Sequence, residues 1–251
     1  MLKSLHHLTH SLVTATDGDI GKVKAAFFDD QWWTIRYLVV DTGAWLVQRK
    51  VLISPYSVKT PLGTAGHVCV KLTRAMVQDS PDVDTHQPVS RQHEIQMQTY
   101  YGFPDYWDGV GVWGMNAYPI MLPGLLKGRA PLQELLSAED AHLRSSAKVT
   151  GYDIHATDES FGHVQDFVFD DESWTIRYLV IDTRNWWPGG KKVLIATHWI
   201  ESIDWATSTV HVKLTRDQVK NSPQYQEELP IARDYEERLH ASYRRTGYWD
   251  Y

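Results

Sequence analysis

Two Asp-Thr strings are the first residues whose type and spacing could perform chemistry. Residues 39–43 read Val-Val-Asp-Thr-Gly, the hydrophobic-Asp-Thr-Gly pattern of aspartic proteases, which need two such aspartates sharing a proton across a two-fold axis. Residues 182–184 read Asp-Thr-Arg, with arginine where that pattern needs glycine. We therefore interpret Asp41 as the cap of a turn that follows a strand, and not as a catalytic acid.

A glycine string and a histidine group have residue types that can bind a cofactor or a metal. Residues 109–114 match Gly-x-Gly-x-x-Gly, but a dinucleotide site needs a strand before this string and a helix after it, and the sequence predicts neither. His6, His7 and His10 would place two imidazoles one turn apart on a helix, but the residues that correspond to them in the repeat described below are not histidines. We predict no metal and no cofactor. Cys69, the one cysteine, is expected as a small buried side chain on a strand.

No recognisable nucleophile elbow, zinc-protease string or phosphate-binding loop occurs in the sequence. We therefore predict that the chain is not an enzyme.

Two arginines lie inside strongly apolar segments, where an unpaired charge is costly. If the preceding turns are four-residue loops, counting outward places Arg177 opposite Asp166 and predicts a structural ion pair between them. The same count places Arg36 opposite Ala25, so this arginine needs another partner, either Asp41 or a group on a second protein.

The candidate interaction residues are large aromatic side chains in turns and tails, which either pack onto their own domain or anchor an interface. They are Tyr101, Tyr106, Trp107, Trp186, Trp187, Tyr248 and Trp249. A third interpretation is that each tail crosses to the other half of the chain and makes a pseudo-two-fold pair.

The elements that must position these residues form a tandem repeat. Residues 33–39, Trp-Thr-Ile-Arg-Tyr-Leu-Val, recur as residues 174–180, and matching strings on both sides extend the repeat to about a hundred residues. The sequence thus predicts a first domain with its tail at 1–108, a Gly- and Pro-rich linker at 109–141, and a second domain with its tail at 142–251.

Strand signals dominate each copy, because β-branched and aromatic runs alternate with turn residues. The predicted strands are 20–28, 33–40, 46–53 and 68–72 in the first copy, and 192–195 and 209–214 in the second. Thr215 and Gln218 predict a capped short helix, and charge pairs predict a terminal helix at 233–245. The pattern predicts an all-β fold with short helices, in which a small barrel in each half is followed by a short C-terminal helical tail.

Composition and charge limit the partners and the compartment. Lys and Arg number 25 against 31 Asp and Glu, a formal net charge of −6, which predicts no nucleic-acid partner. No stretch reaches the roughly 20 apolar residues that span a bilayer, so we predict no membrane span. A single cysteine and the lack of an apolar signal core predict a cytoplasmic protein.

The repeated strings Ala-Thr-Asp, Phe-Asp-Asp, Trp-Thr-Ile-Arg-Tyr-Leu-Val, Asp-Thr and Val-Leu-Ile resemble the PRC-barrel family, and both halves carry them. This family includes the cytoplasmic domain of the photosynthetic reaction-centre H subunit and the C-terminal domain of a ribosome-maturation factor. The resemblance implies two tandem PRC-type β-barrels that serve protein contacts without a common catalytic centre.

Together these observations predict a non-enzymatic interaction or scaffold module, in an assembly like that of the reaction-centre H subunit or in a regulatory role. The partners are expected to be proteins, with a homo-oligomer or an internal pseudo-two-fold pair as the arrangement. The alternative is a small-ligand or metal-binding regulatory protein that uses an aromatic pocket between the barrels. Such a protein would melt at a higher temperature with the right ligand.

Overall fold

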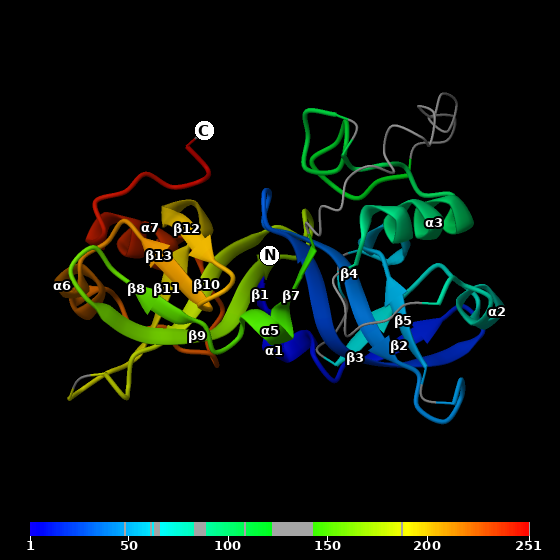
Figure 1. The fold of residues 1–251 in the computed structure, drawn as a ribbon, viewed down its shortest axis with the longest axis horizontal. Coiled ribbons are helices and arrows are strands. Elements are labelled where there is room, and N and C mark those ends of the chain that lie inside the picture. Colours follow the sequence, from blue (N-terminus) through cyan, green and yellow to red (C-terminus); the bar gives the residue numbers. More distant parts are fainter. Residues whose placement is uncertain are drawn as a thin grey trace. The chain divides into compact units, whose positions relative to one another are not determined.

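The computed structural model describes residues 1–47, 49–60, 62, 66–82, 89–107, 109–121, 143–186 and 188–250. Contacts divide the chain into two compact units. The N-terminal unit comprises His7–Ala147 and Asp171–Thr175, and the C-terminal unit comprises Met1–His6, Lys148–Asp170 and Ile176–Tyr251. Each unit is built around one β-sheet (Figure 1).

The sheet of the N-terminal unit has the strand order β5-β4-β3-β2-β6, and β7 joins it by pairing with β3. The pair of β2 with β6 is parallel and the other pairs are antiparallel. The strands are β2 (Leu12–Ala15), β3 (Gly18–Asp29), β4 (Thr34–Asp41), β5 (Lys50–Ile53), β6 (His67–Cys69) and β7 (Leu143–Ser145).

The sheet of the C-terminal unit has the order β11-β10-β9-β8-β13-β12, and β1 joins it by pairing with β9. Here the pair of β8 with β13 is parallel, as its counterpart is in the other sheet. The strands are β1 (Leu2–Ser4), β8 (Asp153–His155), β9 (Ser160–Asp170), β10 (Ile176–Asp182), β11 (Lys192–Ala196), β12 (Ile200–Asp204) and β13 (Thr209–Val212).

The helices of the described residues are short. They are α1 (Leu5–Leu8), η1 (Pro55–Ser57), α2 (Arg74–Gln78), α3 (Arg91–Tyr101), α5 (Ser146–Val149), η2 (Thr197–Trp199), α6 (Arg216–Asn221) and α7 (Arg233–Ser242). Thr215 and Gln218 form the predicted capping box of α6. None of these helices has the length and apolar character needed to cross a bilayer.

The first strand of each repeat pairs within the sheet of the other repeat (Figure 1). β1 runs antiparallel to β9, and β7 runs antiparallel to β3. In the C-terminal unit, the Ser4 hydroxyl donates to Asp166 Oδ2 at 2.5 Å and the His6 N–H donates to Asp166 Oδ1 at 2.9 Å. In the N-terminal unit, the Ala26 N–H donates to the Ser146 hydroxyl at 3.0 Å. Strands, and not the aromatic tails, are therefore the segments that cross between the two copies.

A glycine in the long hairpin of the C-terminal unit permits a close approach of two strands. Gly162 has a φ of +65°, and a Cβ added to it would lie 2.5 Å from the Asp182 carbonyl oxygen. Any other residue at this position would be both strained and in collision with β10.

The structure confirms the all-β fold with short helices, and the predicted strands 20–28 and 33–40 correspond to the paired strands β3 and β4. The second copy has the equivalent hairpin, β9–β10. Among the described residues, neither strand order returns to its first strand, so each sheet is open.

Candidate functional site

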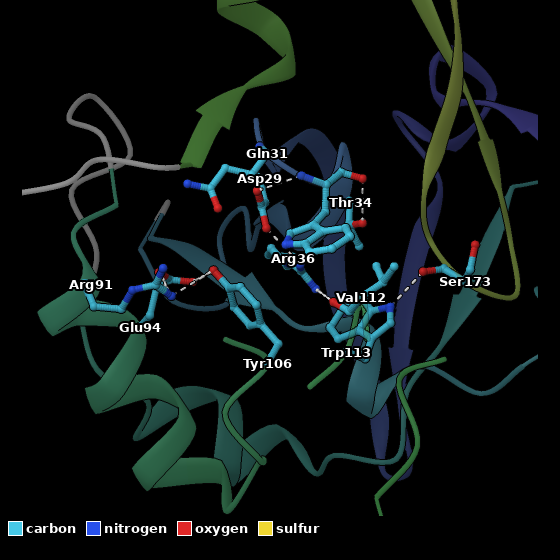
Figure 2. A network of polar contacts seen from close by, with 11 residues as sticks. Asp29, Gln31, Thr34, Arg36, Arg91, Glu94, Tyr106, Val112, Trp113 and Ser173 are labelled. Atoms are coloured by element: carbon cyan, nitrogen blue, oxygen red, sulfur yellow. Dashed lines mark hydrogen bonds and ion pairs between the residues drawn. The ribbon is translucent and has the colours of Figure 1, made fainter. Parts of the chain in front are cut away.

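A buried ion pair lies at the centre of a polar cluster in the N-terminal unit (Figure 2). Arg36 on β4 donates from Nη2 to Asp29 Oδ2 at 2.8 Å, and only 1% of the arginine side chain is exposed. Its Nη1 donates to the Val112 carbonyl oxygen at 2.6 Å. Asp29 also accepts the main-chain N–H groups of Gln31 and Trp32, and so closes the β3–β4 turn. The carboxylate and both terminal guanidinium nitrogens therefore have hydrogen-bond partners, whereas the buried Arg36 Nε has none among the described residues.

Two aromatic rings enclose the Arg36 guanidinium. Its Cζ lies 3.7 Å from the ring centroid of Tyr106 and 4.7 Å from that of Trp113. Trp113 also packs edge-on against Tyr56, with centroids 4.9 Å apart, and its Nε1 donates to the Ser173 carbonyl oxygen at 2.7 Å. This geometry combines a hydrogen-bonded cation with cation–π contacts to two rings.

Residues 109–116, here named the tryptophan turn, cover the buried arginine. Main-chain hydrogen bonds of 2.6 and 2.9 Å close this turn on itself. A Cβ on Gly109 would lie 2.4 Å from the carbonyl group of Gly114, so glycine permits the close approach. The Gly-x-Gly-x-x-Gly string therefore serves to place the Val112 carbonyl and the Trp113 ring, and residues 115–121, directly after it, form no helix.

Glu94 on α3 ties the aromatic tail to this helix (Figure 2). The carboxylate is buried, accepts the Tyr106 hydroxyl at 2.5 Å and lies 3.0 Å from Arg91 Nη1. Burial raises the pKa of Glu94 to about 7, although Arg91, the Tyr106 hydroxyl and Arg36 act to lower it. Burial and the Glu94 charge raise the pKa of Tyr106 well above its ordinary value, so the tyrosine remains a protonated donor. We call Arg36, Arg91, Glu94 and Tyr106 the N-terminal arginine cluster.

The C-terminal unit repeats this arrangement with the equivalent residues of the second copy. Glu236 accepts the Tyr248 hydroxyl at 3.0 Å and lies 3.1 Å from Arg233 Nη1. Arg177 Cζ lies 4.3 Å from the Tyr248 ring centroid. Arg233 Cζ lies 4.1 Å from the Trp249 ring, the distance found for the equivalent pair of the first copy. We call Arg177, Arg233, Glu236 and Tyr248 the C-terminal arginine cluster.

A β-bulge positions the central arginine of each cluster. In the β3–β4 ladder the pairing skips Arg36, which lies between Ile35 and Tyr37. In the β9–β10 ladder it skips Arg177 in the same way. A bulge redirects the side chain of its extra residue, and here both arginines reach a tyrosine of their own tail.

The two clusters differ in how the central arginine is covered. The side chain of Arg36 is 1% exposed, whereas that of Arg177 is 26% exposed. Tyr56, on which Trp113 packs, is buried, whereas His198, its equivalent in the second copy, is exposed. Within the part of the chain that the structure describes, Arg177 has no hydrogen bond to a carbonyl oxygen like the one that Arg36 makes.

The expected ion pair between Arg177 and Asp166 is not formed. The register places Asp166 opposite Val180, where its carboxylate accepts the hydrogen bonds from β1 and the residues after it. Burial raises the pKa of Asp166, although these hydrogen bonds act to lower it. Arg177 Nη2 instead lies 3.9 Å from Asp170 Oδ2. The count misplaced this pair because the turn is longer than the assumed four residues, since Phe169 pairs with Ile176, and the bulge at Arg177 shifts the ladder by one more residue.

The first-copy arginine also has a different partner from those expected. Arg36 pairs with Asp29 of its own hairpin, and not with Asp41. Asp41 instead accepts the Gly43 N–H at 2.9 Å, which confirms its predicted role as the cap of a turn.

The candidate interaction aromatics are covered to different extents by their own unit. Tyr101 and Tyr106 are buried, and Trp107, Tyr248 and Trp249 are half-buried. Trp186 is 36% exposed, and Trp187 lies outside the described residues. The duplicated Tyr-Trp tail therefore packs on the helix and strand of its own arginine cluster.

The remaining candidates are not assembled into a metal or redox site. Cys69 lies on β6 but is exposed, so its expected burial is wrong; its neighbour Val68 takes the inward position of the alternating strand. The described residues contain no group of three or more His, Cys, Asp or Glu side chains that could hold a metal ion.

Sequence reasoning missed the charged residues of the two helices. Arg91 and Glu94 have the same Arg-x-x-Glu spacing as Arg233 and Glu236, at equivalent places in the two copies. A repeated acid that falls on a helix next to an aromatic tail is the signal that indicates a cluster of this kind.

Comparison with known proteins places the second copy in a family. Residues 144–219 match the PRC-barrel domain, a range that covers β8 to β13 and the beginning of α6. No curated protein matched the chain. The comparison therefore identifies residues 144–219 as a segment that matches the PRC-barrel domain family.

Proposed function

We propose that the chain is a non-enzymatic protein-interaction module that carries two PRC-type β-barrel domains in tandem. The observation that carries this proposal is the PRC-barrel match at residues 144–219, because that domain suggests a protein-interaction module. The N-terminal copy supports a second domain of the same type. It repeats the central strand path, the parallel pair, the bulged arginine and the helix–tail cluster.

The chemistry of the arginine clusters supports binding over catalysis. Glu94 and Glu236 are both buried, and each is held by an arginine and by a tyrosine hydroxyl. Groups held in this way fix the helical tail on the sheet, whereas a catalytic acid or base needs access to a substrate. In this proposal the cytoplasmic chain acts as a scaffold whose exposed surfaces contact other proteins.

The test is affinity capture from the lysate of the native host, with the tagged full-length chain as bait. We expect a stoichiometric protein partner. The Trp107→Ala/Trp249→Ala double variant should release it if the tails shape the binding surface, and circular dichroism verifies that this variant is folded. Trp32→Ala, an exposed tryptophan outside both clusters and outside the candidate interaction residues, is the matched control.

Failure to capture any partner at stoichiometric amounts would contradict the proposal. A melting temperature that rises with a small molecule and not with a protein would favour a ligand-binding protein instead.

A further inference from the structure

In the N-terminal unit, the tryptophan turn of the chain itself covers the central arginine of the cluster. The tryptophan turn gives the buried arginine a carbonyl acceptor at 2.6 Å and an indole ring at 4.7 Å. The same indole covers Tyr56, which is 2% exposed. One short turn therefore gives the arginine a hydrogen-bond acceptor and also covers the Tyr56 ring.

The C-terminal unit has equivalents of the residues that the tryptophan turn contacts, but no equivalent turn covers them among the described residues of this unit. Arg177, His198 and Tyr248, here named the open arginine face, correspond to Arg36, Tyr56 and Tyr106. Arg177 stacks on Tyr248 at 4.3 Å, as its counterpart does on the equivalent tyrosine. Yet 26% of the Arg177 side chain is exposed, and His198 is exposed. The arginine that stacks on the tail tyrosine is thus present in both units, but no carbonyl and no indole ring like those of the tryptophan turn lie on it among the described residues of the C-terminal unit.

We propose that the open arginine face is the docking site for a glycine-rich turn of a protein partner that presents a main-chain carbonyl to Arg177 and a tryptophan ring to Arg177 and His198. This inference rests on the proposed function as an interaction module and names the chemistry of its partner.

The chemistry of the face favours this occupant over a simple acidic residue. The charge of Arg177 is already approached by Asp170 at 3.9 Å, so a second carboxylate would meet a negative neighbour. A neutral carbonyl accepts from the guanidinium without that repulsion. His198 stacks on His240 with centroids 5.8 Å apart. Partial burial of the ring, His240 and Arg177 lower the pKa of His198, which favours the uncharged ring at neutral pH. An uncharged ring at this place can pack against an indole as Tyr56 does in the first copy.

The test is an NMR titration of the isotope-labelled full-length chain with a capped peptide, Gly-Val-Gly-Val-Trp-Gly-Met-Asn, which copies the tryptophan turn. We expect saturable shifts at Arg177 Nε–H and at residues around His198, with no comparable shifts at the covered Arg36. Replacing the peptide tryptophan by alanine should weaken binding at least tenfold, and so should Arg177→Met. Arg184→Met removes an exposed arginine outside the cluster and should leave binding unchanged.

Three results would overturn the site: no saturable binding at millimolar peptide, binding that survives Arg177→Met, or equal binding of an acidic peptide without tryptophan. Failure here is distinct from failure of the proposed function. A stoichiometric protein partner that remains bound to Arg177→Met would leave the interaction module standing and remove only this docking site. The absence of any captured partner would count against the module itself.

Discussion

The same substitution in the two arginine clusters should have very different effects on stability. Arg36→Met and Arg177→Met both keep an unbranched apolar stem and remove the charge and the N–H donors. In the N-terminal unit, the change leaves Asp29, which is 5% exposed, without a cation at 2.8 Å. In the C-terminal unit, the lost contact spans 3.9 Å between side chains that are 26% and 23% exposed.

The magnitudes follow from burial. Removing one partner of a buried ion pair costs about 3–5 kcal/mol, and the lower part of that range applies here because Asp29 keeps two main-chain N–H donors. An exposed pair contributes about 0–1 kcal/mol, and an exposed cation–π contact adds about 0.5–1 kcal/mol. We therefore expect a cost of roughly 3 kcal/mol for Arg36→Met and roughly 1 kcal/mol for Arg177→Met. The difference corresponds to about 30-fold in the local unfolding equilibrium.

The assay must resolve the two units, because a single melting temperature is not well defined for a chain with two compact units. Native-state hydrogen exchange at β4 and β10 reports the local free energy of opening in each unit. Equal losses of protection in the two variants would show that burial does not set the cost of losing the arginine. So would a larger loss for Arg177→Met.

Three further predictions concern protonation, strand exchange and close packing. The pKa of Glu94, about 7 in the folded unit against an ordinary 4.5, means that the folded state binds more protons between these values. The stabilisation from protonated Glu94 should be complete below pH 4.5, and the free energy of unfolding should fall by roughly 3 kcal/mol as pH rises through 7. Urea titrations at a series of pH values measure this fall, and Glu94→Gln should abolish it. Ser4→Ala should lower protection from exchange in β9 by about 1–3 kcal/mol, because buried Asp166 loses a donor; unchanged protection there would contradict the exchanged strand. Gly162→Ala should destabilise the C-terminal unit more than Gly189→Ala, since both have positive φ but only the Gly162 Cβ would collide with backbone; equal effects in chemical denaturation would show that the collision is relieved.

The repeat and the local patterns made much of the fold predictable. Alternating apolar runs located the hairpins, and Thr215 with Gln218 located the start of α6. Short strands escaped prediction: β1 and β7 have three residues each, and their pairing is decided by long-range contacts and not by local propensity. The exchange of these strands is invisible in a sequence where both copies carry the same signal.

The site was less predictable because it depends on a bulge and on a segment read as a linker. The assumption of a four-residue turn placed Arg177 opposite Asp166, whereas Phe169 pairs with Ile176 and a bulge then leaves Arg177 unpaired in the ladder, facing Tyr248. The glycine string at 109–114 had no counterpart in the repeat, so nothing in the pattern indicated that it covers Arg36.

If a protein partner covers the open arginine face of the second copy, a photoreactive group placed on that face should capture it. The most direct measurement is site-specific photo-crosslinking in the native host, with a photoreactive amino acid in place of His198 and, as a control, in place of exposed Lys220 on α6. We expect an adduct from position 198, absent from position 220, whose crosslinked peptide contains tryptophan in a glycine-rich segment. An adduct from position 220 alone, or a crosslinked peptide at position 198 without tryptophan, would contradict this expectation.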